Sequence, residues 1–463
     1  MITLFENKLN KKLDTDDSFI ELLRRFREAT FDLKLEGAEG SFFAMLVARL
    51  FRYAKGPFLI LSPTEQEAET LVRDISLFTD RVYLFPSWNV LPYRNKDTSP
   101  ILAGQRMHRL IQMLDAEPYI IVSSLRSFLT ALPPPDFVRR QIRTVRVGDD
   151  FDPVELSGLL QKYRYLRVPR VSVPGEYALR GEVLDVYLPG DEAAVRIVFE
   201  WDQVEKISLF DPLSQASIRE LDSVRLFPSS EILWDSPQRG RLAELLPRTP
   251  EVLESIDELG ACEDEVFFFP ACFEERAALT DYLDQKATQF FLADERLSNG
   301  SESLWNEYQQ LYREARIKKI PALSPDKILF SFEELQERHH RRITVPVLRD
   351  PQQKRIRFNY EDPRSFFGNI NYMKSELKNL LENGYDITIC GETEMQAQRI
   401  RRLLQDLELE VVATKISSGF ALPDFKLMLI QENEIFGRRR RPPASVKRTR
   451  TQVIDTFVEL NPG

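Results

Sequence analysis

The sequence predicts an α/β protein that is interrupted by a smaller α+β region. Three observations support this fold class. Buried-type strands alternate with amphipathic helices up to about residue 131, a pattern typical of a parallel sheet covered on both faces. Three prolines at 133–135 end the alternation, and short strands of alternating polarity follow them. Helical periodicity returns near residue 229, and a last α/β unit occupies residues 366–436.

The first region carries the strands and helices of a parallel sheet in order. Apolar residues at helical spacing predict helix within residues 1–35, which end in a short strand. Thr64 is the expected N-cap of a later helix, and Glu67 completes a capping-box pattern there. The strands expected in this region are 31–35, 57–63, 82–85 and 119–123. The helices expected between and after them are 42–53 and 65–78, with a further helix running to residue 131.

The later regions contain shorter elements. Residues 149–163 are acid-rich and contain one expected helix, and the polar segment 346–363 is interpreted as a linker. The strands expected in the α+β region are 144–147, 178–188 with a tight corner, 194–201 and 204–209. Beyond it we expect strands at 266–269, 289–293, 386–390, near 411 and at 426–430, and helices at 372–383 and 393–406.

Composition and charge exclude several classes of function. At 463 residues the chain is long enough for three or four domains. A net charge of −9 argues against a nucleic-acid coat, so DNA contact would need a local basic patch. Three scattered cysteines and three histidines argue against a disulfide frame, a metal site or a hydrolytic triad. The N-terminus lacks a leader pattern and no apolar run approaches about 18 residues. We therefore expect a soluble cytoplasmic protein without membrane contact.

A glycine turn between the first strand and the next helix has the form of a degraded phosphate-binding loop. Gly37, Gly40 and Ser41 stand where such a loop would present its backbone amides. A working loop ends in Gly-Lys-Ser/Thr, whereas residues 42–44 are Phe-Phe-Ala. The lysine that neutralises phosphate charge and the hydroxyl that holds magnesium are therefore both missing. Taken alone, glycines in this pattern are more often a tight turn.

An acidic pair follows the apolar strand at residues 289–293. Asp294 and Glu295 have the form of the element that positions magnesium in nucleotide-hydrolysing proteins, although such a pair is common by chance. With the glycine turn, it indicates a decayed nucleotide site. We therefore predict no ATP hydrolysis by this chain, and no catalytic residue, metal or cofactor of its own.

Arg180 lies on a strand of the α+β region. It alternates with Ala178, so these two side chains share one face of the sheet while Leu179 points to the other. A planar guanidinium on an exposed sheet face is a good anchor for the carboxylate of a partner. The alternative is a solvated edge arginine, or an arginine paired with Asp185 or Glu182.

Residues 150–215 resemble the UvrA-binding domain shared by UvrB and the transcription-repair coupling factor family. The motifs that carry the likeness are the two-strand run at 173–187, the strands at 196–200 and 204–212, and Gln215. The resemblance implies that three arginines bind UvrA and that their guanidinium groups project into solvent from one small sheet. They are Arg164, Arg180 and Arg196.

A second segment is closer to the coupling-factor family than to UvrB. Residues 85–93 read Phe-Pro-Ser-Trp-Asn-Val-Leu-Pro-Tyr, which is similar to that family. UvrB proteins carry a long tyrosine-rich hairpin in this region that clamps DNA, and the short span from Pro92 to Leu110 leaves no room for it. The chain also departs from UvrB at Ala178 and Val198, where UvrB often has arginine and glutamate. The resemblance thus implies a UvrB-like scaffold without its ATPase or its DNA clamp.

The resemblance also implies a domain order. We expect a UvrB-like split parallel-sheet domain with a degenerate nucleotide site, an inserted UvrA-binding domain, a C-terminal α/β domain and a linker. The boundaries implied are 1–136 and 229–347 for the split domain, 137–228 for the inserted domain, 348–437 for the last domain and 438–463 for the linker. Four arginines at 438–441 and further basic residues up to 450 predict a disordered, positively charged linker.

The function implied by the resemblance is recruitment of UvrA to stalled RNA polymerase in nucleotide excision repair, together with autoinhibition of a DNA translocase motor. We expect the chain to be the N-terminal half of such a protein. RNA polymerase, double-stranded DNA, ATP and magnesium would then be bound by a C-terminal half beyond residue 463. The alternative is a UvrB-like ATP-dependent DNA-damage-recognition protein or helicase, and Phe43 in place of lysine argues against it.

Overall fold

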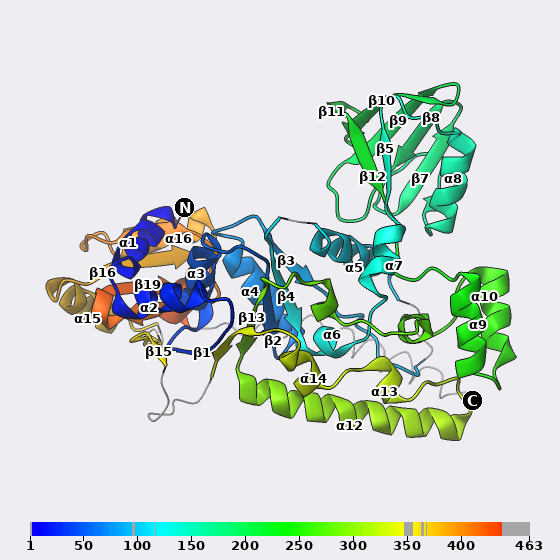
Figure 1. Cartoon of the computed structure of the whole chain (residues 1–463). Helices are drawn as coiled ribbons and strands as arrows, with labels where there is room; N and C mark the ends of the chain where they lie inside the picture. Colours follow the sequence, from blue (N-terminus) through cyan, green and yellow to red (C-terminus); the bar gives the residue numbers. More distant parts are fainter. Residues whose placement is uncertain are drawn as a thin grey trace, which may run out of the picture. The chain divides into compact units, whose positions relative to one another are not determined.

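The computed structural model describes residues 2–94, 98–115, 117–346, 355–362, 365–366 and 368–437. The chain forms two compact units (Figure 1). The first unit comprises residues 1–13, 39–42 and 359–463, and the second comprises residues 14–38 and 43–358. The basic linker predicted at 438–463 lies outside the described residues.

A seven-stranded parallel sheet is the centre of the second unit. Strands β2 (Phe58–Ser62) and β4 (Ile120–Ser124) are buried along their whole length, as expected for strands covered on both faces. The strand order is β15-β1-β14-β13-β2-β4-β3, and every neighbouring pair is parallel. The other strands are β15 (Ile356–Arg357), β1 (Phe31–Glu36), β14 (Arg341–Val345), β13 (Thr288–Leu292) and β3 (Val82–Phe85). The expected parallel α/β sheet is therefore confirmed.

The helices of this sheet follow its strands in the chain. Thr64 caps α4 (Glu65–Ile75) by accepting a hydrogen bond from the Glu67 amide, which confirms the predicted N-cap. Proline occupies the first turn of α5, where an amide would have no intrahelical partner. The remaining helices before the inserted region are α2 (Asp17–Phe26), α3 (Gly40–Phe51), α5 (Pro100–Met113), α6 (Leu125–Leu129) and α7 (Pro135–Arg140).

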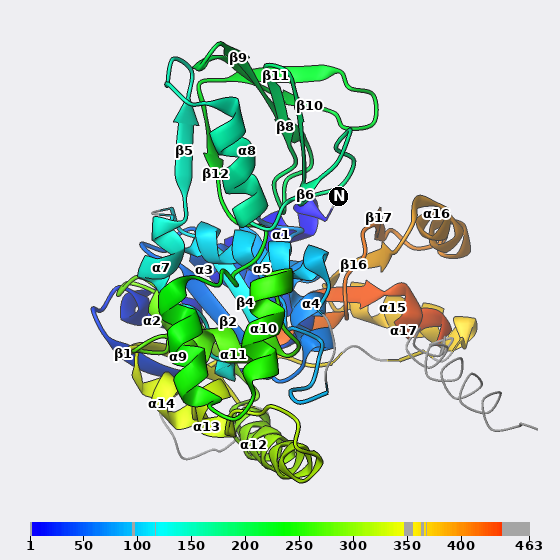
Figure 2. The ribbon, with the colours of Figure 1, turned by 90° about the vertical axis from the view of Figure 1, so that its right-hand side faces the viewer.

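A six-stranded sheet and one helix form the region inserted between the strands of the parallel sheet. Its order is β11-β10-β9-β8-β7-β6, and α8 (Pro153–Lys162) packs on one face (Figure 2). A separate pair, β5 (Arg143–Arg146) and β12 (Ser223–Leu226), joins the start and the end of the region in antiparallel register. The strands are β6 (Leu166–Arg167), β7 (Glu176–Arg180), β8 (Val183–Val186), β9 (Ala194–Glu200), β10 (Gln203–Phe210) and β11 (Ser217–Leu221). This arrangement confirms the expected α+β region.

Helices follow the inserted region. The predicted strand at 266–269 is wrong, because these residues form α11 (Glu265–Phe268) and the start of a 3₁₀ turn (Phe269–Cys272). A short apolar run with no polar alternation does not distinguish a buried strand from a buried helix. The other helices are α9 (Ser236–Leu245), α10 (Pro250–Leu259), α12 (Asp294–Lys318), α13 (Pro325–Ile328) and α14 (Phe332–Glu337), with a further 3₁₀ turn at Leu279–Tyr282.

The first unit has its own core around a four-stranded sheet. Its order is β17-β16-β19-β18, with β18 antiparallel to β19 and the other pairs parallel. Helix α1 (Thr3–Leu13) belongs to this unit, where Phe5 packs edge-on against Phe420. The elements are β16 (Asp386–Gly391), β17 (Glu410–Ala413), β18 (Phe420–Leu422), β19 (Leu427–Gln431), α15 (Ile370–Glu382), α16 (Glu394–Leu403), α17 (Glu432–Phe436) and a 3₁₀ turn (Pro423–Phe425).

Candidate partner-binding surface

The face of the six-stranded sheet that lies opposite α8 carries two of the three arginines singled out by the sequence. Leu184 and Ile197 are directly paired across β8 and β9, and both are buried in the core with the apolar side of α8. The next pair in register, Asp185 and Arg196, therefore points to the other face. Arg180 on β7 shares that face because it alternates with Leu179, which is partly buried against the same core. We call this side of the sheet the outer face.

A single carboxylate organises the two arginines of the outer face. Asp185 is 1% exposed. Its Oδ2 atom accepts from Arg180 Nη2 at 2.7 Å, and its two oxygens accept from Arg196 Nε and Nη2 at 2.6 and 2.9 Å. The guanidinium of Arg196 also donates to Gln215 and lies over the ring of Phe210. The hydrogen bond to Asp185 raises the pKa of Arg196 above its ordinary value.

The two arginines differ in exposure. The side chain of Arg180 is 49% exposed and that of Arg196 is 26% exposed. Arg180 is paired with Asp185, which is one of the alternatives that its sequence context left open. This pairing uses one of the five N–H groups of a guanidinium, and half of the side chain still faces solvent. Arg180 can therefore keep its internal partner and donate to a second carboxylate.

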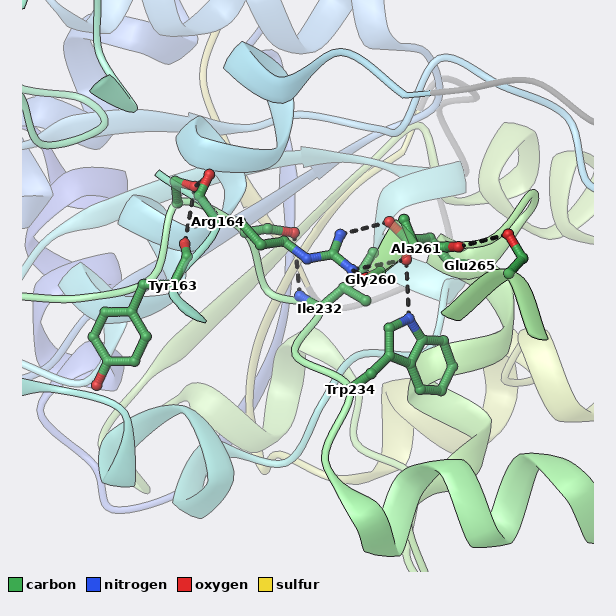
Figure 3. A network of polar contacts seen from close by, with 10 residues as sticks. Tyr163, Arg164, Ile232, Trp234, Gly260, Ala261 and Glu265 are labelled. Carbon is green, nitrogen blue, oxygen red and sulfur yellow. Dashed lines mark hydrogen bonds and ion pairs between the residues drawn. The ribbon is translucent and has the colours of Figure 1, made fainter. Parts of the chain in front are cut away.

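Arg164 lies apart from the outer face, in the turn that follows α8 (Figure 3). Its Nη1 and Nη2 atoms donate to the two carboxylate oxygens of Glu265 at 2.6 and 3.0 Å. Nη2 also donates to the Gly260 carbonyl at 2.6 Å, and Trp234 Nε1 donates to Glu265 at 3.0 Å. The expectation that all three arginines project into solvent from one sheet is therefore wrong for Arg164, which lies outside the sheet and pairs with Glu265. It holds only in part for Arg196, which lies on the sheet but is mostly covered and paired with Asp185.

A cleft of about 830 Å³ lies beside Arg164. Its wall includes Ser229 and Ser230, the first residues of α5, and helices α10 and α11. Cys262 also lines it, and burial raises the pKa of this thiol well above its ordinary value, so the thiol stays protonated. Within the described ranges, no group of three or more His, Cys, Asp or Glu side chains is arranged to hold a metal ion.

The glycine turn is occupied by protein groups. Gly40 has a φ of +51°, and a Cβ atom placed there would lie 2.3 Å from Ser418 Oγ of the same unit. Ser41 Oγ lies 3.3 Å from Ser417 Oγ and accepts from the Ser418 amide at 3.4 Å. Gly37 also has a positive φ, of 69°. The glycines therefore serve a tight turn, and the side chains of 417–418 fill the space beside Gly40.

The acidic pair begins α12, one residue after the end of β13. Asp294 carries one buried oxygen without a hydrogen-bond partner among the described residues, and Glu295 is exposed. β13 and β1, the strand that leads into Gly37, are separated in the sheet by β14. Phe43 packs edge-on against Phe290 of β13, so an aromatic contact stands where the sequence lacks the phosphate-binding lysine.

The inserted region and the chain as a whole are similar to known proteins. Residues 144–232 match the family described as the UvrB interaction domain. The chain is similar over almost its whole length to transcription-repair-coupling factors. It is 24% identical to that of Borreliella burgdorferi over 96% of this chain and 40% of the relative. It is 23% identical to that of Bacillus subtilis and 24% identical to that of Staphylococcus epidermidis, over 96% and 97% of this chain and 42% of each relative.

The sequence resemblance to the coupling-factor family is thereby confirmed. The chain spans about two fifths of the length of the relatives that it matches. The UvrB interaction domain contains the whole outer face and Arg164, whereas Gly260 and Glu265 lie beyond its end. Arg164 therefore links the UvrB interaction domain to the helices that follow it.

A second link between the UvrB interaction domain and the parallel-sheet region is fully buried. Arg106 of α5 is 0% exposed and Glu231 is 2% exposed; Nη2 of Arg106 donates to Glu231 Oε1 at 3.1 Å. The guanidinium also lies over the rings of Phe85 and Trp88. Burial raises the pKa of Glu231, and Arg106 opposes this shift. Neither this pair nor the role of Glu265 could be predicted from the sequence, because partners that lie far apart in a chain leave no periodic signal.

Among the described residues, no helix is both long enough and apolar enough to cross a bilayer.

Proposed function

We propose that this chain recruits UvrA during transcription-coupled nucleotide excision repair, and that the outer face of its UvrB interaction domain makes the contact. The observation that carries this proposal is the Arg180–Asp185–Arg196 cluster on that face. The similarity to transcription-repair-coupling factors over 96% of the chain supports the cellular process. Arg164 contributes to the same function from the turn after α8.

The chemistry of the outer face suits an acidic partner. Asp185 fixes the two guanidinium groups before binding, which lowers the entropy cost of ordering long side chains at an interface. The cluster contains one carboxylate and two guanidinium groups, so its formal net charge is +1. A carboxylate of UvrA that approaches Arg180 can form charge-assisted hydrogen bonds while the internal pair is kept.

The test is a titration of purified UvrA with the full chain and with Arg180→Ala. Truncation of an interface hot spot costs about 2 kcal/mol, so we expect the Kd to rise roughly thirtyfold. Arg139→Ala is the matched control, because Arg139 is exposed, pairs with the exposed Asp136 on α7 and should leave the Kd unchanged. Normal binding by Arg180→Ala would contradict the surface, and absence of binding by the unmodified chain would contradict the function.

We further propose that the chain hydrolyses no ATP, so that the alternative of a UvrB-like ATPase is not favoured. Three features support this: the missing lysine, the Phe43–Phe290 contact and the occupation of the glycine turn by Ser417 and Ser418. Turnover that disappeared in Asp294→Ala would contradict the proposal.

The wider roles of the coupling-factor family are proposals for a longer protein that contains this chain. They are displacement of stalled RNA polymerase by ATP-driven translocation on double-stranded DNA, and inhibition of that motor by the half that recruits UvrA. The similarity to the relatives supports them, and we place this activity in the cytoplasm. The acidic balance of the chain, −9 overall, is consistent with DNA contact by other parts of such a protein.

A further inference from the structure

The C-terminal end of α12 carries a concentration of positive charge on a chain that is acidic overall. Four of the seven residues from 313 to 319 are lysine or arginine, and Glu314 is the one acid among them. All four cations are exposed, and none forms an ion pair with another residue that the structure describes. They are Arg313, Arg316, Lys318 and Lys319, which we call the α12 cation cluster. Figure 1 shows α12 in the second unit, with α13 beside it.

The neighbouring carboxylates neutralise little of this charge. Glu314 lies 3.9 Å from Arg94, a further exposed cation, and accepts a hydrogen bond from Gln310 at 3.1 Å. On α13, which packs against α12, Asp326 is followed directly by Lys327. The surface around the end of α12 therefore combines six cations with two carboxylates, so its formal net charge is +4.

The helix holds the α12 cation cluster on a rigid support. Leu311 is 7% exposed and Ala315 is 2% exposed, so the last two turns of α12 are anchored in the core. Lys319 ends the helix with a φ of +58°, and its amide donates to the carbonyls of Ala315 and Arg316. The cations therefore project from a fixed backbone, which lowers the entropy cost of binding.

The helix dipole explains only part of the α12 cation cluster. Cations in the last turn of a helix offset the partial negative charge there, and Arg316 and Lys318 are placed in that way. The effect falls off within one turn, so it does not account for Arg313, nor for Arg94 from a separate segment. A surface of charge +4 on a chain of charge −9 has the character of a local site for a polyanion.

The composition of the α12 cation cluster favours a nucleic-acid backbone over an acidic protein. Protein interfaces are depleted in lysine and enriched in aromatic side chains, whereas residues 313–319 contain two lysines and no aromatic residue. Single-stranded nucleic acid stacks its bases on aromatic rings, so this surface suits a duplex better. From Arg313 to Lys319 the helix rises about 9 Å, a length over which one strand of a duplex presents about three phosphates.

We propose that the α12 cation cluster binds the phosphate backbone of double-stranded DNA without reading its sequence. Phosphate contacts position a protein on a duplex and carry no sequence information directly, so two duplexes of unrelated sequence should bind with the same Kd. This site lies on a different element from the outer face, and the inference does not rest on the proposed recruitment of UvrA.

Fluorescence anisotropy of the full chain with a short labelled DNA duplex tests this site. The cluster variant carries Arg313→Ala, Arg316→Ala and Lys318→Ala, and α12 should persist because alanine is the best helix former. Each phosphate contact contributes about 0.9 to the slope of log K against log salt, so we expect that slope to be less steep by about 2 to 3. At about 50 mM salt the Kd should rise on the order of tenfold.

Two controls separate the α12 cation cluster from the general effect of charge. The first replaces with alanine three exposed cations that form no ion pair among the described residues, Arg27, Arg248 and Lys286. It changes the net charge equally and should leave the slope unaltered. The second control, Arg313→Lys with Arg316→Lys, keeps the charge and should keep most of the affinity. The basic residues at 438–450 are common to every protein compared, so the differences report the cluster.

Equal slopes in the cluster variant and the charge-matched control would overturn the inference. Tighter binding of a single strand of the same length would also overturn it. Displacement of the duplex by an equal charge of poly-glutamate would assign the surface to an acidic protein instead. If urea unfolding shows that the triple variant is unstable, Arg313→Ala alone keeps the test decisive, since it should change the slope by about 1.

This inference and the proposed function can fail independently. The cluster variant should bind UvrA with the Kd of the unmodified chain, and Arg180→Ala should keep the salt slope of DNA binding. A cluster variant that lost affinity for UvrA but kept the slope would overturn the DNA site. Normal UvrA binding by Arg180→Ala would instead contradict the outer face and leave the DNA site standing.

Discussion

At the scale of single residues, Asp185 has the largest influence on the outer face. Its carboxylate is shared by two guanidinium groups that would repel each other without it. A carboxylate that is 1% exposed is costly unless it is paired, so the arginines stabilise Asp185 as much as Asp185 orients them. Arginines proposed to contact a partner here therefore also stabilise the sheet that carries them.

Asp185→Asn should lower both the local stability of strands β7–β9 and the affinity for UvrA. The amide keeps the shape but turns two N–H donors toward the guanidinium groups, so we expect about 1–2 kcal/mol less protection of the β7–β9 amides against opening. We also expect a Kd for UvrA that is raised about tenfold, because the arginines lose their common anchor.

Hydrogen exchange of the β7–β9 amides and a UvrA titration measure the two effects of Asp185→Asn. Asp202→Asn is the control, since Asp202 is exposed in the turn between β9 and β10. Unaltered exchange in Asp185→Asn would show that the cluster contributes nothing to the sheet.

Asp191 gives the UvrB interaction domain a dependence on pH. Burial raises the pKa of Asp191 to about 6, so between about pH 4 and pH 6 the native state keeps a proton that the unfolded chain has released. Stability therefore falls as the pH rises through this window. Asp191→Asn should raise the stability at pH 7 by about 1 kcal/mol once solvent screening is allowed for, and should change nothing at pH 4.

Urea unfolding midpoints of the unmodified chain and Asp191→Asn, measured from pH 4 to pH 8, check this prediction. Two parallel pH profiles would contradict it.

At the scale of elements, regular periodicity was sufficient for most of the fold. The buried runs that became β2, β4 and β13 and the capped helix α4 lie within two or three residues of their expected bounds. The strand predicted at 266–269 is wrong because these four residues are buried in a helical turn, which Pro270 follows directly. A run of buried apolar residues looks the same in a strand and in such a turn. β11 gave no usable pattern because almost all of its side chains are exposed.

The turn between β1 and α3 provides a test of what its glycines do. Gly40→Ala should lower the free energy of unfolding by about 2–4 kcal/mol, because it adds a positive-φ penalty and a clash with Ser418. Gly148→Ala is the matched control, since Gly148 also has a positive φ but no atom lies within 4 Å of its would-be Cβ. Gly148→Ala should lower the free energy of unfolding by only about 1 kcal/mol.

Denaturant unfolding of both glycine variants measures the difference. Equal losses would mean that packing against Ser418 does not constrain residue 40.

At the scale of the whole molecule, the sequence predicted the type of each folded region better than it predicted which segments join into one compact unit. It indicated a parallel sheet, an inserted α+β region and a last α/β unit, and each is present. It did not indicate that α1 and residues 39–42 group with residues 359 onward. Such grouping depends on contacts like Phe5 with Phe420, which local periodicity does not encode. The same limit explains why the pairs of Arg164 with Glu265 and Arg106 with Glu231 were missed.

The pairing of β5 with β12 has a consequence for how this protein could be altered. Arg143 and Leu226 are register partners, so the polypeptide enters and leaves the inserted region at neighbouring points about 5 Å apart. A short loop could close that gap, and a homologous insert with the same spacing could be spliced in its place. Partner choice could thus be exchanged between scaffolds by two cuts in the gene, provided that the transplanted piece carries a side chain that pairs with Glu265 as Arg164 does.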